Sequence, residues 1–431
     1  MATFDLDPSQ QQAWEQFLAR KNVGLFGRAG SGKSTVLGRA ISHARRVHGV
    51  ASVGVVAWTT TAASIIDGCT FHKFLGIKVD DRAKEVILKK VSGNRFVRDK
   101  LRKTKVIFVD EVPQFDSKWF SVFEYLVRQL APPYKHALPW GGVQVVVGGD
   151  PLQLGPVCRV KETAPPPPVF MCRVFRDSFL SRYGLLVFLL GTHRQSSGGW
   201  FVQCLDRIRV GTFTDMDLLV LNATSAGVTD AEWASRTQLR ALNKDVNEFN
   251  REKLAELPRA TTVYTCADTI NPRITHPARI EYIKKRLQQV APLDVTVKAG
   301  AVVMLTREVE GIPTATQGTI EQCGEVSVDC VFGGKKVVVP LVPFDIIDNC
   351  GTLLGTRKAM PLLLAWAMTI HRAQGANLDS LAVDFSNLRW REPGLVYSGI
   401  SRCRLFEHLY VRGLTRDQIV VCADAMSFYN L

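Results

Sequence analysis

The segment from Asn22 to His48 constrains the fold of this 431-residue chain more than any other. It begins with the apolar run NVGLF, continues through the glycine-rich string GRAGSGKS at 27–34, and ends in a stretch with apolar residues at helical spacing. A buried strand, a tight glycine loop and a helix, in this order, are typical of the first half of a βαβ unit. The segment therefore predicts an α/β domain built on a parallel sheet.

Three more runs of the same kind follow along the chain. VGVVAW, VIFVD and VQVVVGG are short, rich in valine and bounded by glycine or charge, which is typical of strands that are buried on both faces. GKSTVLGRAISHARRVHG and SKWFSVFEYLVRQLA lie among these runs and carry apolar residues at helical spacing. The alternation predicts a doubly wound domain over about residues 1–190.

Two stretches depart from this alternation. A basic stretch at about 76–103 contains VSGNRFV, in which Gly93-Asn94 is expected to turn a small hairpin. A second α/β pattern begins near Leu185 and returns with LAVDF and HLYV, which predicts a second domain over 191–431. Residues of about 268–358 hold AVVML, GTIEQC, EVSVDCVF and KKVVVPLV, with no helices expected between them. They predict a small all-β insertion, which we expect to be a barrel.

Composition excludes several classes of protein. A content of 46% apolar and 22% charged residues excludes a disordered chain. The sequence has neither an apolar run of about 18 residues nor a signal peptide, so we expect an intracellular protein of the nucleus or cytoplasm. The ten cysteines form no C-x-x-C pair, which leaves a zinc ribbon without ligands. The 54 basic and 40 acidic side chains give a net charge of +14, which favours a polyanionic partner, most often nucleic acid.

The string GRAGSGKS matches the phosphate-binding motif G-x-x-x-x-G-K-[ST] in full. Its glycines let the backbone N–H groups point at phosphate oxygens, and the following helix N-terminus adds partial positive charge. We expect Lys33 to reach the β- and γ-phosphates of ATP and the Ser34 hydroxyl to hold Mg²⁺. The predicted cofactor-binding set here is Gly27, Arg28, Ala29, Gly30, Ser31, Gly32, Lys33, Ser34 and Thr35.

Polar residues follow two of the predicted strands at the end that faces the ligand crevice. Asp110 and Glu111 come after VIFV, where Asp110 is expected to bind Mg²⁺ and Glu111 to act as the general base; the alternative is a solvated acidic turn. Gln153 follows VQVVVG within GDPLQL. It is expected either to contact the γ-phosphate or to orient water, with a plain polar loop residue as the alternative.

A phosphate loop alone does not distinguish kinases, GTPases, motors and helicases. An N-K-x-D base-reading motif is missing, because Asn243-Lys244-Asp245-Val246 fails the spacing. Seven strings occur in a telling order: WTTTAAS, GCTFHKF, DEVPQ, GDPLQLGPV, THRQ, TIHRAQG and YSGISR. Together they resemble the superfamily 1 DNA helicases of the 5′-to-3′ branch, most closely the PIF family, with RecD and Dda helicases as relatives. The resemblance covers nearly the whole chain.

The resemblance implies two RecA-like domains, 1–190 and 191–431, with ATP between them. It also implies a wedge insertion at about 76–103 in the first and a Src-homology-like β-barrel at about 268–358 in the second. The implied activity is ATP-driven 5′-to-3′ translocation on single-stranded DNA with unwinding of tailed or forked duplex. The implied protein is a monomer that works away from membranes and is recruited by protein partners.

The resemblance also assigns roles to residues beyond the phosphate loop. Gln10 matches a glutamine that reads adenine, and Gln374 one that couples the nucleotide site to DNA. Arg194 in THRQ and Arg402 in SGISR match two arginines that reach the γ-phosphate, although each is alternatively a surface arginine in an ion pair. The matched DNA contacts are Thr59, Phe71, His72, Thr369 and His371.

Some of these DNA assignments leave alternatives open. Phe71 and His72 are adjacent, so we expect one of the two to face the strand, and His72 and His371 are alternatively structural histidines. Phe96 is the candidate for an aromatic wedge, with a small core under the insertion as the alternative. Trp58-Thr59-Thr60 and Pro113-Gln114 depart from the usual Pro-Thr-Gly and Ser-Met of the family. These departures keep open an alternative function, a translocase or protein–DNA remodeller without strand separation. An RNA helicase of the same superfamily is a further alternative, although no reader of the 2′-hydroxyl can be identified in the sequence.

Overall fold

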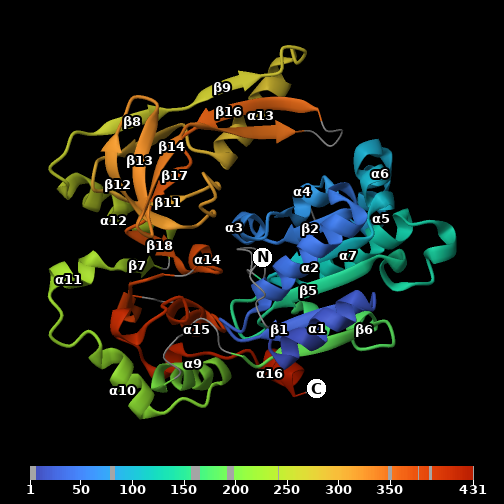
Figure 1. Cartoon of the computed structure of the whole chain (residues 1–431), viewed down its shortest axis with the longest axis horizontal. Coiled ribbons are helices and arrows are strands. Elements are labelled where there is room, and N and C mark those ends of the chain that lie inside the picture. The colour runs from blue at the N-terminus through green and yellow to red at the C-terminus, as the bar shows by residue number, and fades with distance from the viewer. Residues whose placement is uncertain are drawn as a thin grey trace. The chain divides into compact units, whose positions relative to one another are not determined.

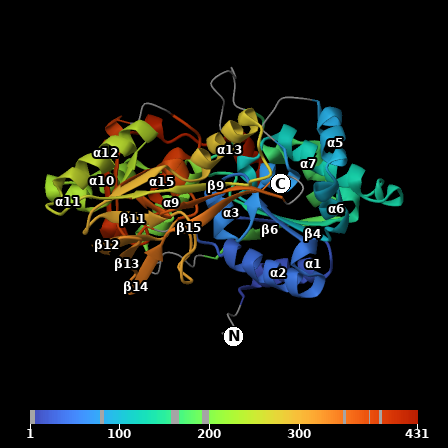
Figure 2. The same ribbon diagram turned by 90° about the horizontal axis from the view of Figure 1, so that it is seen from above.

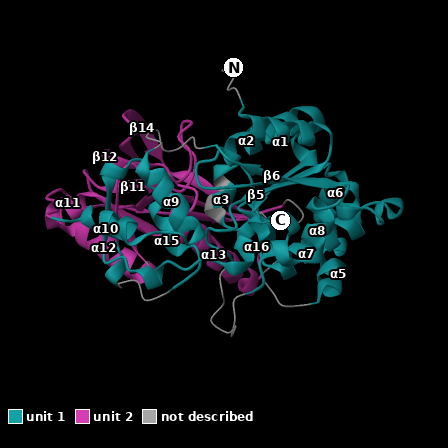
Figure 3. Ribbon diagram, turned by 90° about the horizontal axis from the view of Figure 1, so that it is seen from below, with its two compact units in different colours: residues 1–226, 384–431 teal, residues 227–383 magenta. Residues whose placement is uncertain are grey.

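The computed structural model describes residues 6–77, 83–156, 166–191, 199–240, 242–347, 352–376, 378–387 and 391–430. The chain packs into two compact units, residues 1–226 with 384–431 (unit 1) and residues 227–383 (unit 2), coloured separately in Figure 3. Compact units follow from packing density and need not coincide with the predicted domains, 1–190 and 191–431. That division therefore stays a prediction.

Unit 1 is built on a six-stranded sheet in the order β3-β2-β4-β5-β1-β6, in which every pair of neighbours is parallel. The strands are β1 (Asn22–Gly27), β2 (Val53–Ala57), β3 (Cys69–Thr70), β4 (Val106–Asp110), β5 (Gln144–Gly149) and β6 (Gly184–Leu189). The four Val-rich runs are thus confirmed as parallel strands. The run near Leu185 was expected to begin a second pattern, but β6 pairs with β1 and completes the first sheet. The composition of β6 predicts a strand, but it does not determine which other strand β6 pairs with.

Helices cover both faces of this sheet, as a doubly wound domain requires (Figures 1 and 2). Alternate strand residues face opposite sides: Phe108 packs in a cluster with α1, α2 and α3, whereas Val109 packs in one with α5, α6, α7, α8 and α16. The helices of unit 1 are α1 (Pro8–Leu18), α2 (Lys33–His48), α3 (Thr60–Ile65), α4 (Phe71–Leu75), α5 (Lys84–Gly93), α6 (Arg95–Lys103), α7 (Ser117–Leu130), α8 (Arg173–Phe179), α9 (Trp200–Val210), α10 (Asp215–Ala223), α15 (Leu395–Ile400) and α16 (Ala423–Tyr429). The short strand β20 (Leu409–Arg412) also belongs to this unit.

The basic stretch at 76–103 contains two helices, α5 and α6, so the predicted hairpin at Gly93-Asn94 is wrong. Asn94 is the N-cap of α6, because its side chain accepts a hydrogen bond from the Val97 N–H at 3.3 Å. Asparagine is preferred both at helix N-caps and in hairpin turns, so the string VSGNRFV by itself did not distinguish the two structures. Phe96 is 48% exposed and therefore lies outside the small core under these helices. Its role as a wedge stays a prediction.

Unit 2 begins with a short α/β element. Strand β7 (Thr237–Arg240) pairs in parallel with β18 (Ala367–Thr369) and with β19 (Leu381–Asp384). The helices of this unit are α11 (Asp230–Ser235), α12 (Asn243–Glu256), α13 (Pro277–Val290) and α14 (Ile370–Ala373). The strands LAVD and AMT therefore flank one central strand, as an α/β pattern predicts.

The remainder of unit 2 is rich in antiparallel strands. A five-stranded sheet has the order β14-β13-β12-β11-β17, a three-stranded sheet the order β15-β16-β9, and β10 pairs with β8. These strands are β8 (Thr262–Thr265), β9 (Ala267–Ile270), β10 (Asp294–Val297), β11 (Val302–Leu305), β12 (Gln317–Cys323), β13 (Ser327–Phe332), β14 (Lys335–Pro340), β15 (Val342–Ile347), β16 (Leu353–Ala359) and β17 (Leu362–Leu364). Their alternate apolar residues form a core of their own, which includes Val303, Val328 and Val339. Closure of these strands into a barrel stays a prediction.

The expectation that residues 268–358 hold no helix is wrong. Helix α13 (Pro277–Val290) starts with a proline at its first turn and buries Ile283 and Leu287, four residues apart, against Ile346 and Leu354. A period of four marks a helix face. Only these two residues are buried, so the apolar stripe is narrow and the basic residues between them obscured it.

Two findings bear on the classes of protein that composition excludes. Within the described part of the chain, no helix combines the length and apolarity needed to cross a membrane. The eight cysteines in that part are free thiols.

Candidate functional site

The glycine loop between β1 and α2 has the tight geometry that its motif predicts. Gly30 and Gly32 adopt φ angles of 80° and 82°, in the left-handed region that favours glycine. A Cβ at Gly27 would lie 2.7 Å from both the Leu189 carbonyl oxygen and the Ser31 Oγ. Helix α2 begins at Lys33, whose Nζ donates to the carbonyls of Gly27 at 2.7 Å and Arg28 at 2.8 Å. The ammonium thus lies over the loop, next to the helix N-terminus, which suits a phosphate group.

Neighbouring segments hold this loop from the outside. Gln10, predicted to read adenine, is buried, and its Nε2 donates to the Ser31 carbonyl at 3.5 Å. The Ala29 N–H donates to the Tyr397 hydroxyl at 2.9 Å, and Arg28 pairs with Asp206 on α9. Ser34 and Thr35 are exposed in the first turn of α2, where their hydroxyls are accessible to a ligand. The structure therefore gathers the whole predicted cofactor-binding set of unit 1 around one loop.

The acidic pair lies at the end of β4. Asp110 is buried, and its Oδ1 accepts from the Glu111 N–H at 2.9 Å. Burial first, and then the charge of Glu111, raise the pKa of Asp110 to about 7, against the opposing effects of the Glu111 N–H and the Lys33 charge. Glu111 has φ 49° and ψ 43°, a strained conformation for a residue with a side chain. Such strain is concentrated at functional sites, which favours a specific role over a solvated turn.

These residues are chemically suited to a magnesium–nucleotide complex. Mg²⁺ prefers oxygen ligands, and it binds through one or two carboxylates together with phosphate oxygens and water. The Asp110 carboxylate and the Ser34 hydroxyl are ligands of that kind, and a cation beside Asp110 would oppose the burial that raises the pKa of this carboxyl. No cluster of three or more His, Cys, Asp or Glu that could hold a metal occurs among the described residues.

Two further predicted catalytic residues are buried in unit 1. Arg402 follows α15 and is only 2% exposed; its guanidinium donates to the Ser401 Oγ at 3.0 Å, while its Nε has no hydrogen-bond partner among the described residues. Burial lowers the pKa of Arg402, and the negative charge of Glu111 opposes this effect. Gln153 is buried, and its Nε2 lies 3.4 Å from Asp150 Oδ2. Arg194, the second predicted arginine, falls outside the residues that the structure describes.

The three predicted DNA contacts of unit 1 differ in accessibility. Thr59 is half-buried and accepts from the Ala62 N–H at 3.2 Å. Phe71 is fully buried, and its ring is 5.2–5.8 Å from four aromatic rings, those of Trp58, Phe115, Trp119 and Phe123. The expectation that Phe71 binds DNA is therefore wrong, because a ring enclosed on all sides cannot stack on a base. His72 is half-buried and remains the candidate of the adjacent pair.

The three predicted residues of unit 2 share one turn at the end of β18. Thr369 is largely buried and accepts from the Arg372 N–H at 3.3 Å, which caps the short helix α14. His371 is half-buried on that helix, and the buried Gln374 ends it. The arrangement keeps the three side chains on one structural element, and their assigned roles stay predictions.

Sequence reasoning missed a buried network behind the phosphate loop. Asp150 is fully buried and is contacted by Arg209 of α9 and by the hydroxyl of Tyr429 of α16. The three residues come from segments that are 59 or more positions apart in the chain. Asp150 belongs to the string GDPLQL, which the sequence analysis singled out, whereas Arg209 and Tyr429 belong to none of the seven motif strings. Only folding brings the three residues together.

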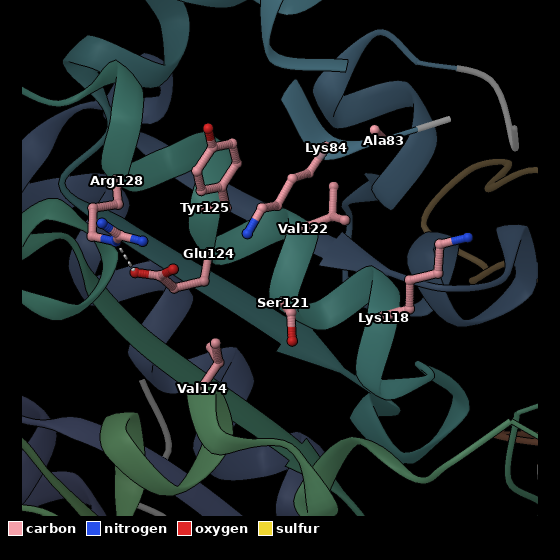
Figure 4. Close-up of a pocket in the computed structure, with 9 residues that line it drawn as sticks. All are labelled: Ala83, Lys84, Lys118, Ser121, Val122, Glu124, Tyr125, Arg128 and Val174. Atoms are coloured by element: carbon pink, nitrogen blue, oxygen red, sulfur yellow. Dashed lines mark hydrogen bonds and ion pairs between the residues drawn. The ribbon is translucent and has the colours of Figure 1, made fainter. Parts of the chain in front are cut away.

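Unit 1 also has a pocket whose lining includes no residue of the phosphate loop. It has a volume of about 390 Å³ and is lined mainly by α5 and α7 (Figure 4). Within it, Glu124 accepts from Arg128 at 2.8 Å, and the Lys84 ammonium lies 4.8 Å from the centre of the Tyr125 ring. None of its nine lining residues belongs to the predicted nucleotide site, so we place that site at the phosphate loop instead.

Comparison with known proteins relates this site to one family. Residues 6–176 match the family model of the PIF1-like helicases. The chain is 27% identical to the ATP-dependent DNA helicase Pif1 of Bdellovibrio bacteriovorus over 99% of its own length and 92% of that protein. It is 28% identical to the ATP-dependent DNA helicase PIF1 of Danio rerio over 99% of its own length and 64% of that protein.

Solved structures agree on the fold. The crystal structure of Pif1 helicase from Candida albicans superposes with a TM-score of 0.83 and 24% identity over 99% of both chains. The crystal structure of Bacteroides sp Pif1 in complex with ADP-AlF4 superposes with a TM-score of 0.73 and 23% identity over 99% of this chain and 97% of that chain. These likenesses concern the α/β fold itself.

Proposed function

The chain belongs to the PIF1-like helicase family, and on that premise we propose that it is an ATP-dependent DNA helicase. Its substrates are ATP and single-stranded DNA within tailed or forked duplexes, and it moves 5′ to 3′. The observation that carries the proposal is the grouping of Lys33, Asp110, Glu111 and Arg402 around the phosphate loop of unit 1. Such a set binds, hydrolyses and senses a nucleoside triphosphate.

Each residue has a role that its chemistry supports. Lys33 and the loop N–H groups bind the β- and γ-phosphates, and Gln10 binds adenine beside the Ser31 carbonyl that it contacts. Ser34 and Asp110 would hold Mg²⁺, which would supply positive charge against the charge that develops on the phosphates. Glu111 takes a proton from the attacking water, and Arg402, together with Arg194, stabilises the negative charge of the transition state.

The DNA-binding part of the proposal rests on three half-buried side chains. His72 supplies a ring for stacking on unpaired bases, and Thr59 and His371 supply donors to phosphate oxygens. The net charge of +14 attracts the strand at low salt. Gln374 couples this strand to the nucleotide site. The 5′-to-3′ direction and the monomeric state are supported by the family resemblance alone.

One observation favours a second candidate, a translocase or remodeller that does not separate strands. The first DNA motif reads Trp58-Thr59-Thr60, and the Trp58 ring packs 4.8 Å from the Phe115 ring and 5.8 Å from the Phe71 ring. A tryptophan committed to packing changes the surface that meets the strand. Grip on DNA is thus the part of the family pattern that this chain alters most.

One experiment tests both candidates. Steady-state ATP hydrolysis is measured with and without single-stranded DNA and single-stranded RNA, in parallel with displacement of a 5′-tailed and a 3′-tailed duplex. Stimulation by DNA with displacement of the 5′-tailed duplex alone is the expected result. Stimulation without displacement of either duplex would favour the remodeller, and stimulation by RNA alone would favour an RNA helicase.

A further inference from the structure

The fully buried carboxylate of Asp150 is shared among residues from three distant segments of unit 1. Arg209 donates to its Oδ1 at 2.8 Å and to its Oδ2 at 3.0 Å, which is a two-pronged contact. Tyr429 donates its hydroxyl to Oδ1 at 3.0 Å, and the Arg209 guanidinium lies 4.5 Å from the centre of the Tyr429 ring. The carboxylate is therefore fixed from α9 and from the last helix of the chain, α16.

This carboxylate in turn fixes the turn that carries Gln153. Asp150 Oδ1 accepts from the Leu152 N–H at 3.2 Å, and the Gln153 N–H donates to the Asp150 carbonyl at 3.0 Å. The Gln153 Nε2 makes a longer contact with Asp150 Oδ2 at 3.4 Å. On the other side of this turn, the Leu154 N–H donates to the Ser398 Oγ of α15 at 3.0 Å. The turn thus has little freedom to place the glutamine elsewhere.

The same contacts decide which end of the Gln153 amide faces Asp150. Burial by itself would raise the pKa of Asp150, but the charge and hydrogen bonds of Arg209 hold it below its usual range, so the group is ionised. An ionised carboxylate only accepts hydrogen bonds, so the amide NH₂ has to face it. The Gln153 Oε1 then points away, and it is buried with no hydrogen-bond partner in the described part of the chain.

An outward carbonyl oxygen separates the two roles that are open for Gln153. Phosphate oxygens accept hydrogen bonds and do not pair with another acceptor, whereas a water molecule donates to one. Asp150 also lies within electrostatic range of Lys33 and Arg402, the residues proposed to bind the γ-phosphate. We propose that Tyr429, acting through Asp150, is a positioning residue that aims the Gln153 carbonyl oxygen at the water that attacks the γ-phosphate. The inference rests on the proposed ATP hydrolysis and deepens it.

Phe428, the residue before Tyr429, anchors helix α16 to the sheet of unit 1. Phe428 is buried, with its ring 5.1 Å from that of Phe26 on β1 and 4.9 Å from that of Phe170. Helix α16 therefore packs against β1, the strand that leads into the phosphate loop. Through Tyr429, the C-terminal end of the chain becomes part of the support of the hydrolytic site.

The test is a double-mutant cycle on the full-length chain, with Tyr429→Phe, Gln153→Ala and the two combined. Tyr429→Phe keeps the ring over Arg209 and removes only the hydroxyl. We expect it to lower kcat for DNA-stimulated ATP hydrolysis by about threefold to tenfold and to leave the KM for ATP unchanged, because the water is aligned only for the chemical step. We expect the combined variant to be no slower than Gln153→Ala alone, because Tyr429 acts through Gln153.

Controls separate positioning from structural damage. Tyr134→Phe removes the hydroxyl of a tyrosine that is 81% exposed, and it should leave both kinetic constants unchanged. The thermal unfolding midpoint of Tyr429→Phe should match that of the wild-type protein within a degree or two, so that the kinetic loss is not a loss of folded protein. Effects of the two substitutions that multiply, or a Tyr429→Phe variant with unchanged kcat, would overturn the inference. A wild-type protein that hydrolyses no ATP with DNA or RNA would instead overturn the proposed function, and this inference with it.

Discussion

The phosphate loop and the His72 region both lie in unit 1, and both were predicted from short strings, yet the structure treats the two predictions differently. The loop is proposed to bind through backbone N–H groups, whose directions follow from glycine spacing and a helix start, and its predicted residues lie together around one turn. The His72 region is proposed to bind through side chains, and one of its two adjacent candidates, Phe71, is sealed in the core. A site that uses backbone N–H groups can be predicted from local sequence. A site that uses side chains also depends on which face of its helix or strand is buried.

The largest expected effect tests the backbone site. Lys33→Ala should lower ATP hydrolysis by about a hundredfold to a thousandfold or more, because the ammonium stabilises charge that grows in the transition state. Binding of a labelled single strand, measured at two salt concentrations, should stay close to that of the wild-type protein. Lys21→Ala removes an exposed lysine one residue before β1 and serves as the control with normal turnover. Retained hydrolysis in Lys33→Ala would remove the phosphate loop as the nucleotide site.

The next effect concerns the strained residue beside this loop. Glu111→Gln keeps the size of the side chain and removes its ability to take a proton, so kcat should fall by about a hundredfold to ten-thousandfold. Binding of a fluorescent ATP analogue should be retained. Glu85→Gln, an exposed substitution on α5, should hydrolyse ATP normally. If Glu111→Gln keeps normal turnover, another group is the general base.

A pair of neighbouring substitutions tests the other side of the comparison. Phe71→Ala should lower the free energy of unfolding by about 3–5 kcal/mol, because it empties a buried aromatic cluster. His72→Ala should lower the unfolding midpoint less than Phe71→Ala does, because the His72 ring is only half-buried, although it contacts the rings of Trp58, Phe71 and Trp119. It should weaken single-strand binding by about fivefold or more, as loss of one stacked base does. Thermal unfolding and fluorescence anisotropy with a labelled oligonucleotide measure the two effects. The reverse pattern would show that Phe71 turns outward when DNA binds.

The smallest expected effect concerns Asp217, which has one hydrogen-bond partner within its own helix cap, Thr214, and another on a different helix, Arg207. Asp217 caps α10 through the Thr214 N–H at 2.9 Å, and Arg207 donates to it at 2.8 Å from α9. The Arg207 hydrogen bonds hold the pKa of Asp217 at about 2, below its unfolded value of about 3.9. A lowered acid pKa stabilises the folded state above pH of about 4, and this gain is lost as pH falls toward 2.

Asp217→Asn should therefore lower the free energy of unfolding by about 1–2 kcal/mol at pH 7 and by less at pH 3. Thermal unfolding at pH 7, 5 and 3 follows the change. Asp215→Asn, at an exposed position of the same helix, is the matched control with little effect at any of these values. An equal loss at pH 7 and pH 3 would show that the ion pair with Arg207 contributes nothing.

Much of the fold was predictable, and the failures have a common cause. The parallel strands β1, β2, β4 and β5 are continuous Val-rich runs, which only a sheet covered on both faces accommodates. Asn94 and helix α13 were misread because their local signals serve two structures equally well: asparagine suits a turn or a cap, and a two-residue apolar stripe in a basic stretch suits a loop or a helix. In both cases packing against another segment decided the outcome.

The candidate site divides in the same way. Gly27 to Ser34, Asp110 and Glu111 are local in sequence, because a strand end and a helix start are enough to place them. Arg209 and Tyr429 show no signal in the sequence, since an arginine on an amphipathic helix and a tyrosine near a chain end are ordinary surface residues until Asp150 is buried between them.

By itself, the sequence determined the parallel sheet, the phosphate loop, the acidic pair and the family, because each depends on residues close together in the chain. Only the tertiary structure decided that β6 completes the first sheet, that Phe71 is core and that Tyr429 of α16 contacts the buried Asp150. The physical reason is burial: whether a ring binds a base or fills a core, and whether a carboxylate attracts an arginine, depends on the water that folding removes, and no short string of residues specifies that.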